Sequence, residues 1–320
     1  MAMNNKKAMY RDFIQSEADA PVFIKDWWLD TVCGRDNWDV ALVEKGGKIV
    51  AALPYYTRKT LFLTFLSMPP LTKTLGVYLT YPPKQKYQKR LSWEKELMQQ
   101  LISQLPRHHL FAQNFDPAYT NWLPFYWKGF SQTTRYTYTI ENLSLEDLDV
   151  NLDTDIRRRR KNAGKLGITV QESDDIPLFY ALNKKTFERK HRAVPYEYEM
   201  VERLYHAATA KDACKIFLAK ESTGKAIAGC FLVYDSRTVY YLMAGVDPET
   251  KDMGGMDIVL YESIRFALSQ DKRFDFEGSM IESIEKYFRS FGAVQTPYSR
   301  ITKTPSKLLR LRTLLQEIRK

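Results

Sequence analysis

Apolar and polar positions along this chain alternate with two periods, one typical of strands and one of helices. Both faces are apolar in 40–43 and again in 49–53, on either side of Gly46 and Gly47. Glycines allow the positive φ angles of a two-residue turn, so these segments predict a hairpin of strands that are covered on both faces. A four-residue period then predicts an amphipathic helix through Trp93, Leu97, Leu101 and Leu105.

Further strands flank that helix. Segments 60–68 and 75–81 are apolar around a break at Pro69 and Pro70, and we expect both to be buried strands. A strand at 109–115, a short aromatic helix and a strand at 132–140 then close a first unit.

The second half of the chain has the same alternation with clearer limits. A β-α-α-β-β-β-α-β-α-β order is expected. Strands are predicted at 168–173, 214–220, 226–234, 238–246, 273–278 and 296–302, and helices at 177–192, 197–210, 255–269 and 283–292.

Two pairs of segments resemble each other across the halves. Segments 38–56 and 214–234 both read as strand, turn and strand, and 110–140 and 273–302 both read as strand, helix and strand. We therefore expect one α/β domain with a mixed sheet to be used twice. The predicted divisions are a degenerate domain at 1–145, a basic helical linker at 146–167, a second domain at 168–303 and a basic amphipathic C-terminal helix at 304–320.

Composition narrows the class of protein. Apolar residues make up 44% and charged residues 27% of 320 residues, which is typical of a soluble globular protein. No apolar run reaches the ~18 residues of a membrane span. Three cysteines without metal or disulfide spacing favour a reduced, cytoplasmic setting. The net charge of +10 favours an anionic partner such as a nucleotide, tRNA or a phospholipid surface, and a merely basic surface is the alternative.

Four segments of the second half carry a resemblance to a known family. They are RRRRKNAGKLGITV at 157–170, KTFERKHRAVP at 185–195, GKAIAGCFLVYDSRTVYYLMAGV at 224–246 and FDFEGSM at 274–280. In this order they resemble the Fem-related branch of the GNAT acyltransferases. That branch includes Fem-type peptidoglycan-bridge aminoacyltransferases and CelD-like acetyltransferases, and many members have two GNAT units. The resemblance implies two tandem GNAT-like domains and an acyltransferase activity.

The resemblance also implies where an acyl donor would bind. In a GNAT domain two central strands part, the gap takes the pantetheine arm of acyl-CoA, and the next helix N-terminus takes the pyrophosphate. The matching loop supplies the candidate cofactor-binding residues Lys251, Gly254, Gly255 and Met256, of which Met256 departs from the family pattern. A plain glycine-containing turn is the alternative. Because the matching loop of the first half lacks glycine, we expect the donor, preferably acetyl-CoA, in the second domain.

Candidate catalytic residues follow the donor loop. Asp275 and Glu277 are two apart in a predicted strand, so both should face one side. Glu277 is the candidate base toward an amine. Asp275 and Ser279 are candidates for substrate binding, with the alternatives that Asp275 holds neighbouring groups and Ser279 caps a helix. Tyr287 and Tyr298 are candidate acids toward a leaving thiolate, or else core residues.

Basic residues could hold the acceptor. Arg189 and Lys190 end a predicted helix in the region that lines the acceptor site of GNAT folds, although cations also favour a helix C-terminus on their own. Residues 157–161 could bind phosphate, the tRNA backbone or a membrane, or form a solvated basic linker. Four histidines without partners at ligand spacing predict no metal site.

Three functions remain open at this stage. The first is an N-acyltransferase that moves an acyl group from acyl-CoA to a small or cell-wall-precursor amine. The second is a Fem-type, aminoacyl-tRNA-dependent aminoacyltransferase that acts on a peptidoglycan precursor. The third is a non-catalytic binding module. Peripheral contact with the inner face of the membrane through 304–320 is an additional expectation. The sequence does not indicate an oligomeric state.

Overall fold

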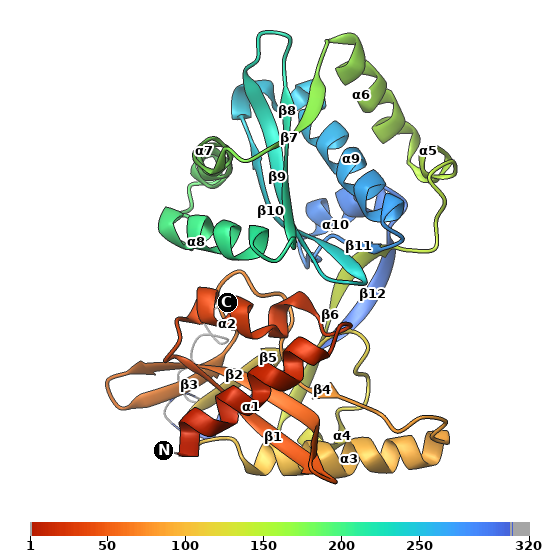
Figure 1. The fold of residues 1–320 in the computed structure, drawn as a ribbon. Helices are drawn as coiled ribbons and strands as arrows, with labels where there is room; N and C mark the ends of the chain where they lie inside the picture. The colour runs from red at the N-terminus through yellow and green to blue at the C-terminus, as the bar shows by residue number, and fades with distance from the viewer. Residues whose placement is uncertain (1, 308, 310–320) are drawn as a thin grey trace. The chain divides into compact units, whose positions relative to one another are not determined.

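The computed structural model describes residues 2–307 and residue 309, so most of the expected C-terminal helix at 304–320 lies outside the described residues. Two compact units are present (Figure 1). The first contains residues 1–135 together with 297–320, and the second contains residues 136–296. None of the helices in the described part of the chain is both long enough and apolar enough to cross a membrane.

The first unit has a mixed sheet in the order β1-β2-β3-β5-β12. Its strands are β1 (Trp38–Lys45), β2 (Lys48–Thr60), β3 (Leu63–Ser67), the short β4 (Tyr78–Leu79), which pairs with β2, β5 (Leu110–Asn114) and the C-terminal part of β12 (Val294–Lys303). Its helices are α1 (Ala2–Ser16), η1 (Val22–Ile24), α2 (Asp26–Cys33), α3 (Tyr87–Ser103) and α4 (Leu123–Trp127).

The predicted glycine hairpin is confirmed. Lys45 pairs with Lys48, and both intervening glycines, Gly46 and Gly47, have positive φ angles of 59° and 75°. The core behind this hairpin brings together Leu53 of β2, Leu97 of α3 and Phe111 of β5, each with no exposed surface.

Three expectations for the first unit were wrong. Two helices, α1 and α2, precede its hairpin, whereas a helix pair was expected only in the second half. The expected strand 75–81 is reduced to Tyr78–Leu79. The expected buried strand 60–68 begins only at Leu63, because residues 61 and 62 form the turn between β2 and β3. The apolar run 60–68 conceals this turn because it contains no glycine, proline or asparagine.

The second unit has a mixed sheet in the order β6-β11-β10-β9-β8-β7. Its strands are the C-terminal part of β6 (Ser131–Ile140), β7 (Thr169–Ser173), β8 (Cys214–Lys220), β9 (Ala226–Tyr234), β10 (Thr238–Val246) and β11 (Arg273–Asp275). Its helices are α5 (Leu148–Asn151), α6 (Thr154–Lys165), α7 (Ile176–Glu188), α8 (Tyr198–Thr209), η2 (Pro248–Met253), α9 (Gly255–Ser269) and α10 (Glu282–Arg289). Helices α7 and α8 cover one face of this sheet, and α6 and α9 cover the other (Figure 1).

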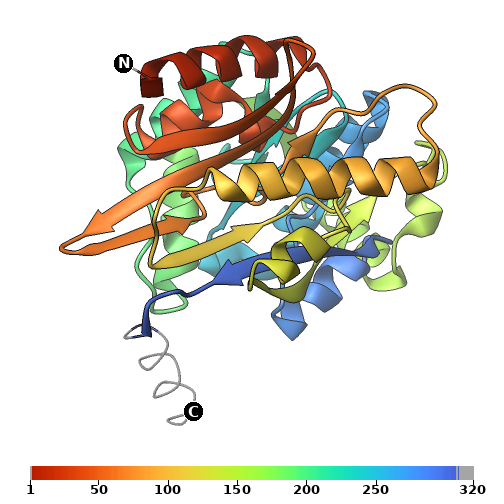
Figure 2. The same cartoon turned by 90° about the horizontal axis from the view of Figure 1, so that it is seen from below.

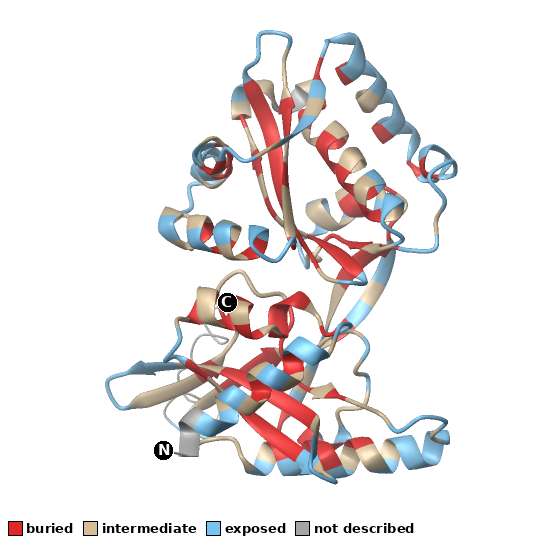
Figure 3. Ribbon diagram, viewed as in Figure 1, coloured by how far each residue is buried: buried red, intermediate tan, exposed pale blue. Residues whose placement is uncertain are grey.

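Helix α6 belongs to the second unit and is not a free linker. Ile156 and Ala163 on one of its faces are fully buried in the same apolar cluster as Ile264 of α9. Its arginines pair within the unit: Arg159 with Asp257, and Arg160 with Asp149. Figure 3 shows the buried stripe of α6 facing α9, with the exposed residues on the opposite side. The basic run therefore stabilises the fold of this unit.

The final strand of each half divides between the units. Arg300 to Lys303 of β12 pair antiparallel with Asn114 to Phe111 of β5, which completes the sheet of the first unit. Residues Thr139 and Ile140 of β6 pair in the same way with β11 of the second unit. The predicted limits of 1–145 and 168–303 do not include this division.

Candidate active site of the second unit

Strands β10 and β11 pair only briefly and then part. They are parallel over three residue pairs, of which the last is Tyr240 with Asp275. Strand β10 continues to Val246 beside β9, with an irregular register between Tyr241 and Met243. Beyond Tyr240, the edge of β10 that faces away from β9 therefore has no neighbouring strand among the described residues. Main-chain groups at such an edge are available to a ligand or to another element.

Helix α7 occupies the far end of that edge. Asn183 Nδ2 donates to the carbonyl of Ala244 at 2.6 Å, and the Val246 N–H donates to Thr186 Oγ1 at 2.9 Å. Tyr196 holds the Asn183 side chain, since its hydroxyl donates to Asn183 Oδ1 at 3.0 Å. The edge that remains open on β10 is thus the stretch between Tyr240 and Ala244.

A buried carboxylate fixes the start of the candidate donor loop, residues 247–256. Asp247 is 1% exposed and accepts hydrogen bonds from Lys185 Nζ at 2.9 Å and from the Glu249 N–H at 3.1 Å. Lys225 Nζ lies 3.4 Å from the same carboxylate. The hydrogen bond from Lys185 holds the pKa of Asp247 below its ordinary value.

The two glycines of the loop have packing roles that the sequence analysis did not foresee. Gly254 adopts φ 79° and precedes α9, and a Cβ there would lie 3.0 Å from the Arg159 carbonyl of α6. A Cβ on Gly255 would lie 2.9 Å from Ile227 of β9. Gly254 is the N-cap residue of α9, and as a glycine it supplies no side-chain cap to the first N–H groups of the helix. Met256 contributes its sulfur, which accepts from the Tyr241 hydroxyl at 3.5 Å.

Asp257 ties three helices together in the first turn of α9. Its carboxylate accepts from Arg159 Nε of α6 at 2.9 Å and from the Tyr287 hydroxyl of α10 at 2.8 Å. Burial, and then the Asp257 charge, raise the pKa of Tyr287 well above its ordinary value. The Tyr287 proton is therefore held by Asp257, which is a structural role.

Asp275 and Glu277 do not share a strand face, so that expectation was wrong. Strand β11 ends at Asp275, and Glu277 has a left-handed φ of 58°. The chain turns here because Asp275, 4% exposed, accepts from the Thr137 hydroxyl at 2.5 Å and from the Glu277 N–H at 2.7 Å. Asp275 thus holds its neighbours, whereas half-buried Glu277 follows the point where β10 and β11 part.

The remaining candidates are scattered. Ser279 Oγ accepts from the Ile281 N–H at 2.9 Å, so it shapes the turn before α10. Arg189 and Lys190 are exposed just beyond the C-terminal end of α7. Tyr298 lies in the part of β12 that belongs to the first unit, 6% exposed, with Lys73 Nζ 5.3 Å from its ring centre. It is therefore a residue of the first unit, whereas Glu277 belongs to the second.

Sequence reasoning missed the residues that build this site, namely Asn183, Asp247 and Asp257. One signal was available: each is a small polar residue inside or next to an apolar stripe, where burial without a partner would be costly. In the described part of the chain, no group of three or more His, Cys, Asp and Glu side chains is placed to hold a metal ion.

The equivalent gap of the first unit is closed. Strands β3 and β5 pair over two residues, and the following segment then returns alongside β5. The Leu75 N–H donates to the Asn114 carbonyl at 2.7 Å, and Asn114 Nδ2 donates to the Lys73 carbonyl at 3.0 Å. In the first unit, main chain near Lys73 and Leu75 thus fills the space between β3 and β5. The corresponding space between β10 and β11 of the second unit stays open.

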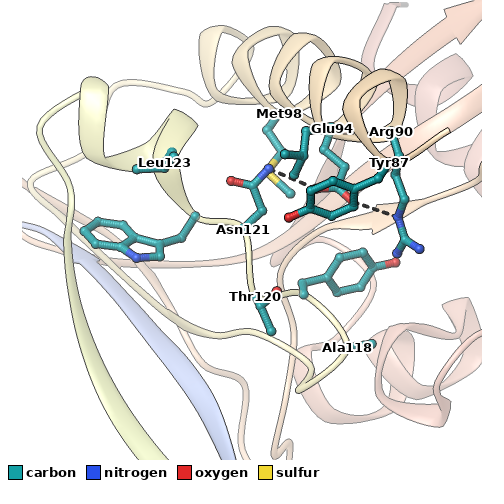
Figure 4. Close-up of a pocket in the computed structure, with 11 residues that line it drawn as sticks. Tyr87, Arg90, Glu94, Met98, Ala118, Thr120, Asn121 and Leu123 are labelled. Carbon is teal, nitrogen blue, oxygen red and sulfur yellow. Dashed lines mark hydrogen bonds and ion pairs between the residues drawn. The ribbon is translucent and has the colours of Figure 1, made fainter.

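A cavity of about 550 Å³ lies instead beside α3 of the first unit (Figure 4). Glu94 is at its base and accepts from Arg90 Nε at 3.1 Å, the Tyr81 hydroxyl at 3.1 Å and Asn121 Nδ2 at 2.9 Å. These bonds tie α3 to the loop after β5. Since the carboxylate already has three protein donors, it fixes the cavity wall and is a poor candidate for a base.

Comparisons with known proteins show what the second unit and the whole fold are similar to. Residues 151–289 match the model of the acetyltransferase (GNAT) domain. The fold is similar to that of FemX, with a TM-score of 0.65, 14% identity, and coverage of 93% of this chain and 96% of that one. It is also similar to the C-terminal domain of a putative lysylphosphatidylglycerol synthetase from Agrobacterium fabrum, with a TM-score of 0.56, 10% identity, and coverage of 93% and 92%. No curated protein matches the chain.

The matched range begins at the end of α5 and ends with α10, so it includes the parted strands, the donor loop and Glu277. Residues 151–289 are thus similar to a GNAT acetyltransferase domain, within a two-unit fold similar to that of FemX.

Proposed function

We propose that the second unit is an N-acyltransferase that moves an acyl group from acyl-CoA, preferably acetyl-CoA, to an amine. The observation that carries the proposal is the parting of β10 from β11 after Tyr240, together with the contact of the next residue, Tyr241, with Met256 in the first turn of α9. An extended thioester arm can hydrogen-bond along an open strand edge, and a helix N-terminus favours phosphate.

Two parts of the second unit would each bind one part of the acyl donor. The open edge of β10 between Tyr240 and Ala244 would take the pantetheine arm. The first N–H groups of α9, with Lys251 from the preceding turn, would take the pyrophosphate. Because α6 covers Gly254 on its Hα side, the phosphates would approach from the N–H side of the loop.

Direct attack accounts for the chemistry with one base. The neutral amine attacks the thioester carbonyl, a C–N bond forms, the C–S bond breaks and the CoA thiolate leaves. The proton released by the amine would pass to Glu277, which follows Asp275, the last residue of β11 that pairs with β10. Positioning of donor and acceptor supplies much of the rate enhancement. Arg189 and Lys190 would contact an acceptor that carries a negative charge.

Calorimetry with acetyl-CoA and CoA tests the donor. We expect Lys251→Ala to weaken CoA binding about tenfold, since a lysine–phosphate contact contributes of that order. Lys211→Ala, at an exposed position after α8, is the matched control and should bind normally. The absence of binding heat at millimolar CoA would refute the CoA donor.

Kinetics test the base. Glu277→Gln should lower kcat by roughly 10²-fold or more with little change in KM, as expected for loss of a general base. The control is Glu282→Gln, an exposed carboxylate in the first turn of α10. Equal kcat values for the Glu277→Gln variant and the wild type would remove Glu277 from the mechanism.

Transfer from aminoacyl-tRNA to a peptidoglycan precursor is the second candidate, favoured by the similarity to FemX over nearly the whole chain. Filter binding with charged tRNA separates it from the first. Tight binding that falls steeply between roughly 50 and 200 mM salt would favour it, because phosphate contacts release counterions.

If the Glu277 and Lys251 variants both keep full cellular function, a non-catalytic binding module becomes the better description. In each case we expect a cytoplasmic protein.

A further inference from the structure

The tip of the β2–β3 hairpin is the most exposed apolar feature among the described residues. Thr60 pairs with Leu63, so the turn consists of Leu61 and Phe62 alone. Leu61 is 97% exposed and Phe62 is 92% exposed. Figures 2 and 3 show the hairpin projecting from the first unit with an exposed tip.

The turn carries residues that its backbone disfavours. Two-residue hairpin turns need a positive φ and are normally built with glycine or asparagine. Leu61 has a φ of 47°, in the left-handed region, where a branched apolar side chain is strained. Leu61 is thus unfavourable for local conformation, and both Leu61 and Phe62 are unfavourable for contact with water. Strain of this kind at a projecting turn is typical of a functional site.

Two cationic residues precede the tip, and no acidic residue lies near it in the sequence. Arg58 and Lys59 precede it at exposed positions of β2, and residues 57–64 contain no acidic side chain. The Arg58 guanidinium lies 5.5 Å from the centre of the Phe65 ring, so its cation is held on the shaft of the hairpin behind the turn. The hairpin therefore has apolar side chains at its tip and cations just behind them. In an anionic bilayer, the acyl chains likewise lie beneath a layer of negatively charged headgroups.

We propose that this tip is a membrane-contact site, at which Leu61 and Phe62 enter the acyl region of an anionic bilayer while Arg58 and Lys59 contact lipid phosphates. A protein partner fits less well, because a stable protein interface needs about 800 Å² from each side and two side chains at a convex point cannot supply it. The proposal is independent of the acyl-transfer proposal and of residues 304–320.

Sedimentation of the full chain with vesicles tests the proposal. We use phosphatidylcholine alone, and phosphatidylcholine with about one third phosphatidylglycerol. Leu61→Asn with Phe62→Ser should reduce binding to the anionic vesicles about hundredfold, roughly tenfold for each apolar side chain removed. Arg58→Gln with Lys59→Gln should reduce the preference for anionic vesicles at least tenfold and leave weak binding to neutral ones. Val150→Ser, which alters a 75% exposed residue of α5, is the control and should bind like the wild type.

A reporter at the tip identifies the contact itself. Phe62→Cys labelled with an environment-sensitive dye should move to a blue-shifted, brighter emission with anionic vesicles, and Val150→Cys should not. Folding is checked by thermal unfolding, which Leu61→Asn should leave equal or raised because asparagine tolerates a positive φ. The proposal is overturned if the wild type does not sediment, if the double variant sediments equally, or if the label at position 62 stays in water while the protein binds. Concentration-dependent self-association lost in the double variant, without vesicle binding, would instead assign the tip to a second copy.

Discussion

Replacement of Gly245 by alanine should break the contact between β10 and α7 that limits the open strand edge. A Cβ at this position would lie 2.4 Å from the Asn183 nitrogen and 2.5 Å from the Leu182 carbonyl carbon. Both are main-chain atoms inside α7, so no side-chain rotation can relieve the clash. Ordinary contacts between such atoms are about 3.5–4.0 Å, and the helix must therefore move away by roughly 1 Å.

The cost follows from the overpacking and from the bonds that it weakens. Overpacking of a core typically costs about 1–3 kcal/mol. Displacement of α7 also weakens the hydrogen bonds to the Ala244 carbonyl and from the Val246 N–H, each of which contributes about 1 kcal/mol. We therefore expect a loss of about 3–5 kcal/mol from the free energy of unfolding of the second unit. That loss lowers its unfolding midpoint by roughly 6–20 °C.

Tryptophan positions make the assay specific to one unit. All six tryptophans lie in residues 1–135, so their fluorescence reports the first unit, while far-UV circular dichroism reports both. Gly245→Ala should move the circular dichroism transition and leave the tryptophan transition nearly in place. Gly164→Ala, in α6 with open space around its Cβ, is the matched control and should stabilise by about 0.5–1 kcal/mol. Equal midpoints for Gly245→Ala and the wild type would refute the packing argument.

Two further variants test the buried carboxylates. Tyr287→Phe removes one hydrogen bond to Asp257 and should cost about 1.5–3 kcal/mol of stability with kcat changed less than about threefold; a kcat reduced a hundredfold would show that the tyrosine acts in the chemistry. Asp247→Asn should lower the unfolding midpoint at pH 7. Because Lys185 depresses the pKa of Asp247 in the folded state, the carboxylate stabilises above its ordinary pKa of 3.8 and loses that effect as the pH falls through the folded value. The difference between Asp247→Asn and wild type, followed by thermal melts from pH 7 to 3, should therefore shrink with acid, and a constant difference would count against the ion pair.

Much of the second unit could be predicted because its patterns are local. The limits of β8, β9, β10 and α9 match the sequence prediction residue for residue, since each is a continuous apolar run or stripe that ends at a polar or glycine position. The GNAT fold followed from the order of these elements, and the domain match at 151–289 confirms it.

The candidate site was predicted less well because long-range contacts decide it. The period of the FDFEGSM segment favours a longer strand than β11, yet the Thr137 hydroxyl, 138 residues away, bonds to Asp275 and ends it. Gly254 and Gly255 suggest a phosphate loop locally, but α6 and β9 account for both. Tyr298 was a candidate acid within the predicted second domain at 168–303, whereas it belongs to the first unit.

The division of β12 has a consequence for synthesis of the chain on the ribosome. The second unit is one uninterrupted stretch, residues 136–296, and all of it has been translated before the last strand of the first unit. The first unit needs Arg300 to Lys303 to complete its sheet beside β5, so its earlier strands must wait until the whole second unit has been made. During that interval β5 has an unpaired edge, which is a site of aggregation in nascent chains. The unit made first would thus be the last to finish folding.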